Sequence, residues 1–251
     1  MKLSKITRYL DKELGIKSIK DDSKNGLQFR GRSEVKRIVF GVDACLELFE
    51  KAAKRNADMI VVHHGLLWGR SPLKNLDDLG KKRMIFLKKH KISLYACHLP
   101  LDAHPRLGNN IQLSKLFDFK SIKPFAEYHG SSIGYYGNLK KPIGISKFIE
   151  GIGKRLGKPS VILFGPGSVS RLGIVSGGGS DAIKEMSKLK IDTILLGEYG
   201  HSTYHKAKER CINVISAGHY ITETFGVKAV AKELEGRFEV ETEFIDVPTG
   251  L

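Results

Sequence analysis

The sequence has little of what marks secreted, membrane or disulfide-linked proteins. Its three cysteines, Cys45, Cys97 and Cys211, are odd in number and widely spaced, which excludes a disulfide framework. No apolar run approaches the roughly 18 residues that cross a bilayer. Charges interrupt the first residues every two or three positions, so no signal peptide is predicted either. We therefore expect a cytoplasmic protein with no membrane partner.

Several motifs of well-known enzyme classes are also missing. The sequence has no Walker motif, no HExxH zincin motif, no GxSxG nucleophile elbow and no CxxC pair. It has no heptad pattern and no low-complexity tract. The function classes that these signatures define are therefore not expected.

What the sequence does have is an ordinary globular composition with a strong excess of positive charge. Of its 251 residues, 41% are hydrophobic and 27% are charged, which is typical of a folded chain. The formal net charge is +15, and residues 1–125 carry 26 Lys+Arg against 13 Asp+Glu. A basic surface of this kind binds phosphates or nucleic acid. Solvated, lysine-rich helix faces explain the same composition, and no aromatic-interleaved basic motif is present to favour nucleic acid.

Short apolar runs alternate with segments of helical periodicity along the chain. An amphipathic helix is predicted at the start, where Leu3, Ile6, Leu10 and Leu14 recur at helical spacing. The predicted strands are 35–42, 59–62, 92–96, 172–175, 193–196 and 212–215. The predicted helices between them are 46–55, 79–89, 183–188 and 222–234. This alternation predicts an α/β fold with mixed, largely parallel sheets and flanking helices.

A composition change near residues 124–144, where glycine and proline cluster, marks a junction between two halves. Residues 128–136 are also compatible with an antiparallel strand or hairpin. We expect an N-terminal α/β lobe at residues 1–125 and a C-terminal α/β lobe at residues 126–251. Both halves repeat apolar strands followed at once by small or polar residues. This pattern hints at duplication, although no residue-level repeat survives.

The residues that follow the predicted strands are rich in metal-binding types. In parallel α/β sheets ligands bind beyond the carboxyl ends of the strands, so chemistry is expected there. The residues at these places are Asp43, His63, His64, His98, Asp102, Glu198, His219 and Glu223. His98 and Asp102 are four residues apart, as are His219 and Glu223. This interval places both members of a pair on one face of a helix.

Five of these residues form a candidate ligand set for two metal ions: His63, His64, Asp102, His219 and Glu223. Three imidazoles and two carboxylates suit Zn, Mn, Fe, Ni or Co, and they contain too much nitrogen for a Ca or Mg site. Ions bridged by a carboxylate polarise a substrate oxygen and activate water, which is hydrolytic chemistry. The alternative for any single histidine is a capping or surface residue. Further histidines at 104, 129, 201 and 205 make the histidine pattern less specific for a metal site.

Three weaker features each have two interpretations. The glycine run at 176–180 follows a strand, so its backbone amides could hold a phosphate, or it is a flexible turn. Cys97 is a metal ligand or a core residue, and its apolar surroundings favour the core. Trp68 and Arg70 could stack on and hold an aromatic or phosphorylated substrate, whereas the alternative is that Trp68 only anchors its loop.

At these residues the sequence resembles the NIF-three-like family of dinuclear-metal proteins. This family includes the bacterial YbgI proteins, and its members are often named GTP cyclohydrolase I type 2 homologues. The resemblance spans the chain, and its most specific pieces are residues 61–69, 98–102, 197–201 and 218–223. One departure is the segment 97–102, where relatives commonly have a small residue before the histidine and a Thr-rich link. Substrate contacts from this link are therefore expected to differ.

The resemblance implies two related α/β lobes with two divalent metal ions between them. The ions would be bound at His63, His64, Asp102, His219 and Glu223, with the glutamate bridging. It also implies a homo-oligomer, expected to be a ring-shaped or cage-like hexamer, and a two-lobe unit without the inserted domain of many bacterial relatives. The cyclohydrolase name implies attack of metal-bound water on C8 of the guanine ring of GTP.

Two functions follow from these observations. The first is a metal-dependent hydrolase that acts on a nucleotide or other phosphorylated small molecule, in which metal-bound hydroxide attacks and His98 or Glu198 transfers protons. The second is a metal-containing binding or regulatory protein that holds nucleic acid through its basic N-terminal half. A third function, metal trafficking, requires ions that exchange readily with chelators.

Overall fold

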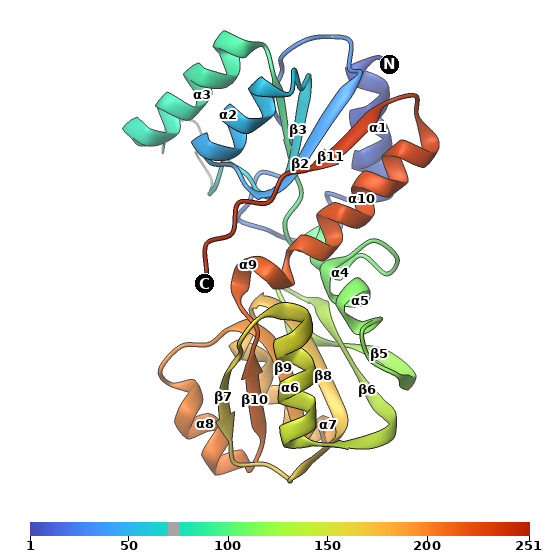
Figure 1. Ribbon diagram of the computed structural model, residues 1–251, viewed down its shortest axis with the longest axis vertical. Coiled ribbons are helices and arrows are strands. Elements are labelled where there is room, and N and C mark those ends of the chain that lie inside the picture. The colour runs from blue at the N-terminus through green and yellow to red at the C-terminus, as the bar shows by residue number, and fades with distance from the viewer. Residues whose placement is uncertain (70–75) are drawn as a thin grey trace. The chain divides into compact units, whose positions relative to one another are not determined.

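The structure is a computed structural model that describes residues 1–69 and 76–251, so Arg70 lies outside the described residues. It divides into two units. The first comprises Met1–Leu107 and Gly226–Val247, and the second comprises Gly108–Phe225 and Pro248–Leu251 (Figure 1). The predicted boundary at residues 125 and 126 differs from this division and falls inside strand β5 (Phe119–Tyr128). Composition could not show that β5 pairs into the second sheet, nor that the chain returns to the first unit after residue 225.

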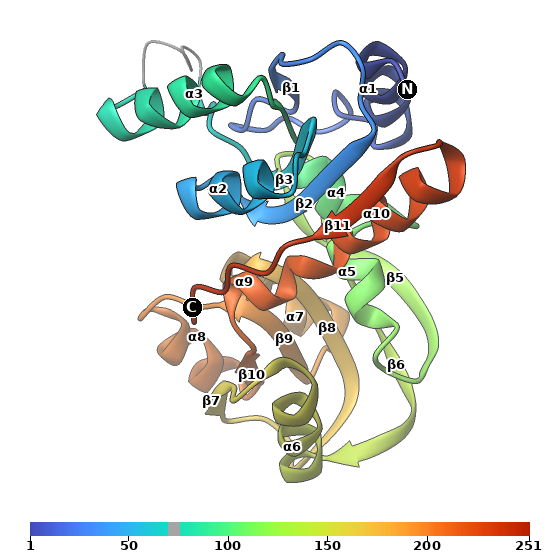
Figure 2. The same cartoon turned by 45° about the horizontal axis from the view of Figure 1, so that its top comes forward.

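The first unit is built on a five-stranded sheet of order β1-β4-β3-β2-β11. Its strands are β1 (Gly26–Phe29), β2 (Arg37–Asp43), β3 (Met59–His64), β4 (Ser93–Ala96) and β11 (Glu241–Phe244). All neighbours run parallel except β1, which is antiparallel to β4. Figure 2 shows β11, from the end of the chain, lying beside β2.

Helices cover both faces of the first sheet (Figure 1). They are α1 (Leu3–Glu13), α2 (Leu46–Lys54), α3 (Asp78–His90), α4 (Leu99–Ala103) and α10 (Thr224–Arg237). Because strand side chains alternate between faces, Ile38 and Phe40 pack with α1 and α10 residues such as Leu10. Val39 on the opposite face packs with Phe49 of α2. The predicted opening amphipathic helix is confirmed as α1.

The second unit has a six-stranded mixed sheet of order β5-β6-β8-β9-β10-β7. Its strands are β5, β6 (Ser131–Gly144), β7 (Ser160–Leu163), β8 (Ser168–Gly178), β9 (Thr193–Glu198) and β10 (Asn213–Ser216). The helical segments are α5 (Asn109–Ser114), α6 (Ile145–Leu156), η1 (Ser180–Ala182), α7 (Ile183–Leu189), α8 (Thr203–Arg210) and α9 (His219–Thr222). Phe148 of α6 packs on Leu195, whereas Met186 of α7 packs on the opposite-facing Leu196.

The two units repeat the same local construction. Asp58, just before β3, accepts hydrogen bonds from the N–H groups of Lys36 and Arg37 at 2.8 and 3.2 Å. Asp192, just before β9, accepts from Ser170 and Arg171 at 3.0 and 2.7 Å. The residues that follow β4 and β10 also match. Cys97, after β4, donates its N–H to Val62 O, and Ala217, after β10, donates its N–H to Leu196 O. The predicted α/β class with two related lobes is confirmed.

The two sheets differ in strand direction. The first is largely parallel, as predicted, whereas the second has a parallel centre of β8, β9 and β10 with antiparallel strands on both sides. None of the helices in the described part of the chain combines the length and the apolar character that a membrane crossing demands.

Candidate metal centre

Three histidines of the first unit converge at the carboxyl ends of β3 and β4. His63 and His64 are the last two residues of β3, and His98 follows β4 and precedes α4. The ring centroids of His63 and His64 are 4.7 Å apart, and those of His63 and His98 are 5.1 Å apart. One ligating nitrogen from each of the three rings lies within 4.8 Å of the others. The structure thus brings together three of the residues that were predicted to follow these strands.

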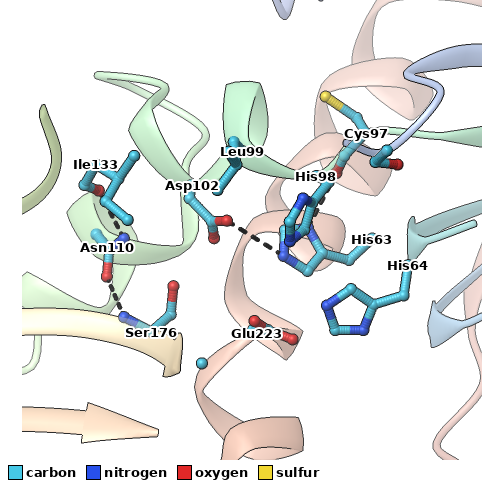
Figure 3. Close-up of polar contacts among 12 residues, drawn as sticks. His63, His64, Cys97, His98, Leu99, Asp102, Asn110, Ile133, Ser176 and Glu223 are labelled. Atoms are coloured by element: carbon cyan, nitrogen blue, oxygen red, sulfur yellow. Dashed lines mark hydrogen bonds and ion pairs between the residues drawn. The ribbon is translucent and has the colours of Figure 1, made fainter. Parts of the chain in front are cut away.

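Each of these rings has its Nδ1 held by an oxygen. His63 Nδ1 donates to Cys97 O, His64 Nδ1 to Asp43 Oδ1 and His98 Nδ1 to Asp21 Oδ1, all at 2.9 Å (Figure 3 shows the His63 contact). A carbonyl and an ionised carboxylate only accept, so Nδ1 carries the proton and Nε2 is the nitrogen suited to a metal. This arrangement orients metal-binding imidazoles in proteins generally.

A buried carboxylate of the first unit lies beside these histidines. Asp102 lies on α4, is 5% exposed, and places Oδ2 3.3 Å from His63 Nε2 (Figure 3). Its four-residue interval from His98 comes from the turn of α4 that begins at Leu99. The first unit therefore offers imidazole nitrogen and carboxylate oxygen side by side.

The second unit offers a histidine between two glutamates. His219 begins α9, and its Nε2 is 3.1 Å from Oε1 of Glu223, which is 3% exposed. Its Nδ1 donates to Glu198 Oε1 at 3.0 Å. The hydrogen bond to Glu223 is the largest cause that raises the pKa of His219 to about 9, against the lowering effect of burial. The predicted pairing of His219 with Glu223 across one helical turn agrees with this geometry.

The glycine run of the second unit makes room for this pair. Gly177 has φ +60°, and a Cβ built on it would lie 2.3 Å from Glu223 Oε1 and 3.2 Å from His219 Nε2. Its amides are already engaged. Ser176 N–H donates to Asn110 at 2.6 Å (Figure 3), and Gly177 N–H donates to Thr222 at 3.1 Å. The interpretation as a phosphate cradle is therefore not supported, because these donors face protein acceptors.

Of the carboxylates that orient the histidines, sequence reasoning missed Asp21. Asp21 is 3% exposed at its side chain and lies in a loop without periodicity, so no pattern distinguished it. Burial acts to raise the pKa of Asp21, but its hydrogen bond to His98 and the His98 charge outweigh that effect and lower the pKa to about 2. Asp43 and Glu198 were detectable because each ends a strand.

Residues outside the ligand set take ordinary structural roles. The Cys97 thiol packs in the core, where burial raises its pKa, in agreement with the core interpretation. His104 bonds the Glu13 carbonyl, and His129 lies in the turn between β5 and β6 with φ +50°. Trp68 donates its Nε1–H to Gly65 O at 2.8 Å and packs its ring edge against His98. It therefore anchors its loop and also borders the histidines.

The fold and these residues define a two-unit α/β protein with clustered candidate metal ligands. Comparison with known proteins identifies its family. The chain belongs to the family described as Duf34/NIF3 (NGG1p interacting factor 3), which matches residues 1–250. The predicted NIF-three-like membership is thus confirmed.

Individual relatives cover the full length of the chain. A protein of Pyrococcus abyssi named GTP cyclohydrolase 1 type 2 homolog is 43% identical over 100% of both chains. Among solved structures, the protein ybgI, described as of unknown function, has a TM-score of 0.91 at 34% identity and covers 99% of both chains. The crystal structure of TTHA1606 from Thermus thermophilus has a TM-score of 0.89 at 38% identity over 100% of both chains.

Proposed function

We propose that this protein is a metal-dependent hydrolase that acts on a nucleotide or another phosphorylated small molecule. The ligands are His63, His64 and Asp102 from the first unit and His219 and Glu223 from the second. These five residues would hold two divalent ions. The observation that carries the proposal is that every histidine of this set has its Nδ1 held by an oxygen and offers one ligand atom within 4.8 Å of other metal-binding groups.

In each unit, the candidate residues are of types that bind metal ions. Imidazole nitrogens and carboxylate oxygens in this ratio suit Zn, Mn, Fe, Ni or Co. Gly177 supplies space beside Glu223 and His219 that a side chain would fill. Bound ions would polarise a substrate oxygen and lower the pKa of a coordinated water.

The chain's own residues would orient the ligands and move protons. Asp43 and Glu198 fix the rings of His64 and His219 through Nδ1. Glu198 is 56% exposed at its side chain, so it is accessible to exchange a proton with solvent or substrate. Glu198 or His98 is the proposed proton carrier. The guanine nucleotide implied by the relatives' name is the first substrate to test, and the basic first half would favour its phosphates.

The metal and the activity are tested separately. The first measurement is elemental analysis of the purified protein beside the His63→Ala, His64→Ala double variant, with about two ions per chain expected in the first and a marked loss in the second. The metal-loaded protein is then incubated with GTP, other nucleotides, phosphoesters and amides, and products are followed by chromatography. His219→Ala with Glu223→Ala should abolish turnover. Two retained ions with no turnover on the whole panel would refute the hydrolase and leave the metal centre standing.

A second candidate function, nucleic-acid binding, is favoured by one face of α3. Lys81, Lys82, Lys88 and Lys89 recur at helical spacing and are all exposed. Such a face binds polyanions with an affinity that falls steeply as salt rises. Fluorescence anisotropy with labelled DNA and RNA tests it, with Lys82→Glu and Lys89→Glu as the variant. Absence of binding at low salt would eliminate this function.

We also propose that the chain forms a homo-oligomer, by resemblance a hexamer. Six chains of 27.9 kDa would sediment together in analytical ultracentrifugation. The mass of a single chain at micromolar concentration would contradict the proposal.

A further inference from the structure

We infer that a cavity of the first unit holds a planar ring of the substrate, and that Trp68, Asp77 and Arg83 select a ring with a carbonyl next to an N–H. The inference rests on the proposed function, because it names a part of the substrate that lies outside the metal centre. The cavity has a volume of about 260 Å³, and its walls are the loop after β3 and the start of α3. Pockets for whole drug-sized ligands begin at about 300 Å³, so this one suits a single ring system.

The indole of Trp68 supplies an aromatic wall of the cavity. It is half-buried, and its Nε1–H donates to Gly65 O at 2.8 Å, which fixes its orientation. Its ring centroid lies 5.1 Å from that of His98 and 6.2 Å from that of His64. Planar heterocycles stack on aromatic side chains whatever their substituents, because each has a π-face. A ring held on Trp68 would therefore lie next to the candidate metal ligands.

The guanidinium of Arg83 brings an unsatisfied hydrogen-bond donor to the same cavity. Its Nε is buried, and no residue in the described part of the chain accepts from it. A buried N–H without an acceptor is costly, so its place in the lining of a cavity indicates that a ligand supplies the acceptor. A carbonyl oxygen on the edge of a planar ring is such an acceptor, and the flat guanidinium matches it in geometry.

Asp77 gives the cavity an acceptor and disfavours an anion as its occupant. Its Oδ1 caps α3 by accepting from Gly80 N–H at 2.6 Å, and Oδ2 is a further acceptor. A phosphate would meet this negative charge, and the dipole of α3 is already compensated by it. A donor from Arg83 and an acceptor from Asp77 together match a ring whose carbonyl lies beside an N–H, as in oxo-purines and oxo-pyrimidines.

The wall that carries Trp68 is held in place by the fold around it. Gly65 packs so closely that a Cβ on it would lie 2.3 Å from Gln28 Nε2. Gln28 is buried, and its Oε1 accepts from Leu66 N–H at 2.7 Å and from Leu67 N–H at 3.2 Å. A wall fixed in advance is typical of sites that bind small molecules.

Binding of inosine and adenosine tests the inference, because Trp68 is the sole tryptophan of the sequence. Its fluorescence, excited where nucleosides absorb little, reports a ring in the cavity directly. Inosine has a carbonyl beside an N–H, whereas adenosine, of the same size, has an amino group beside an acceptor nitrogen. We expect inosine to bind about tenfold more tightly or better, because adenosine leaves buried polar groups unpaired. Equal affinities, or no fluorescence change with either nucleoside, would overturn the inference.

Variants of α3 assign the selectivity to single residues. Arg83→Gln removes the guanidinium and should weaken inosine binding about tenfold. Asp77→Asn keeps a good helix cap but adds a donor, so it should narrow the difference between inosine and adenosine. Lys82→Gln removes the same charge as Arg83→Gln from an exposed position and should change neither affinity. Circular dichroism checks that each variant is folded. Unchanged inosine affinity in folded Arg83→Gln would contradict the role of the guanidinium.

The proposed function and this inference fail in different ways. If inosine binds with the expected dependence on Arg83 and no nucleotide is turned over, the ring site stands and the hydrolase is refuted. If nucleotides are turned over and Arg83→Gln leaves the ratio of kcat/KM for inosine and adenosine triphosphates unchanged, the hydrolase stands and the ring site is refuted.

Discussion

At the scale of single residues, the absence of a side chain at position 177 is as important as the candidate metal ligands. Gly177→Ala places a methyl group where Glu223 Oε1 now lies, and it does so at φ +60°, which disfavours any Cβ. We expect the carboxylate to move and the metal affinity of the wild-type chain to fall at least tenfold. Competition with a chromogenic chelator measures this affinity.

The control for this change is Gly130→Ala. Gly130 also has a positive φ, +79°, but a Cβ there meets nothing within 4 Å. It should therefore cost the same backbone strain, about 1–2 kcal/mol, without any effect on metal binding. Equal metal affinities in the two variants would show that Gly177 acts through strain rather than through the space beside Glu223.

Candidate ligand residues were predictable from the sequence where they end or follow an apolar run. His63 and His64 end an apolar run, and His219 and Glu223 follow one, so the sheet rule located them without a structure. Asp21 could not be located in this way. It reaches His98 across 77 positions of sequence, and only tertiary folding brings the two together.

At the scale of elements, an aspartate before one strand accepts two backbone hydrogen bonds from the neighbouring strand or its start, and this arrangement occurs in both units. Asp58 joins β3 to the start of β2, and Asp192 joins β9 to β8. Replacing either by Ala leaves two backbone N–H groups without their acceptor, so each change should lower the free energy of unfolding by about 2 kcal/mol. Asp58→Ala should cost slightly more, because it also loses the ion pair with Arg32 at 2.9 Å.

Urea unfolding followed by circular dichroism measures these costs. Asp118→Ala is the control, because Asp118 pairs with Lys140 at the surface with 76% of its side chain exposed. Such exposed ion pairs contribute less than about 1 kcal/mol to the free energy of unfolding. A cost for Asp192→Ala as small as that of the control would show that the turn before β9 does not need its carboxylate.

Strands that are buried on both faces were predictable from the sequence, whereas strand β11 was not. The predicted runs at 59–62, 92–96 and 193–196 fall within or end together with β3, β4 and β9, because strands buried on both faces are continuous apolar runs. Strand β11 has the sequence ETEF, and its residues are exposed or half-buried, so no apolar run marks it. The prolines and glycines of β5 and β6 indicated a junction, and the antiparallel strand or hairpin left open at residues 128–136 is confirmed as part of a long antiparallel pair.

At the scale of the whole molecule, ion pairs link segments from both ends of the chain within the first unit. Glu233 of α10 accepts from Arg106 at 2.6 Å and from Tyr9 of α1. The Arg106 hydrogen bond is the largest cause that lowers the pKa of Glu233 from about 4.5 to about 2, against the raising effect of burial. The carboxylate thus favours the folded state wherever it is ionised.

The pH dependence of stability follows from the sign of this shift. Above about pH 4.5 the contribution of Glu233 is complete, and it is lost as pH falls toward 2, because the unfolded chain takes up the proton first. Glu233→Gln should lower stability by about 1 kcal/mol at pH 7, and the difference from wild type should shrink below pH 4.5. Urea titrations at pH 7, 5 and 3 measure it, with exposed Glu235→Gln as the control. A difference that grows in acid would contradict this sign.

Removal of the metal should lower the stability of the whole chain. Ions that bind only the folded state stabilise it by RT ln(1 + [M]/Kd), about 2.7 kcal/mol at a free metal concentration one hundred times Kd. For a chain of this size that corresponds to a Tm about 5–10 °C higher than that of the chelated protein. The His63→Ala, His64→Ala variant should unfold at the same temperature with and without chelator, because it lacks ligands that the folded state alone brings together. If chelation strips the wild-type protein of its ions and leaves Tm unchanged, those ions are bound equally well by the unfolded chain, and a site assembled by folding is excluded.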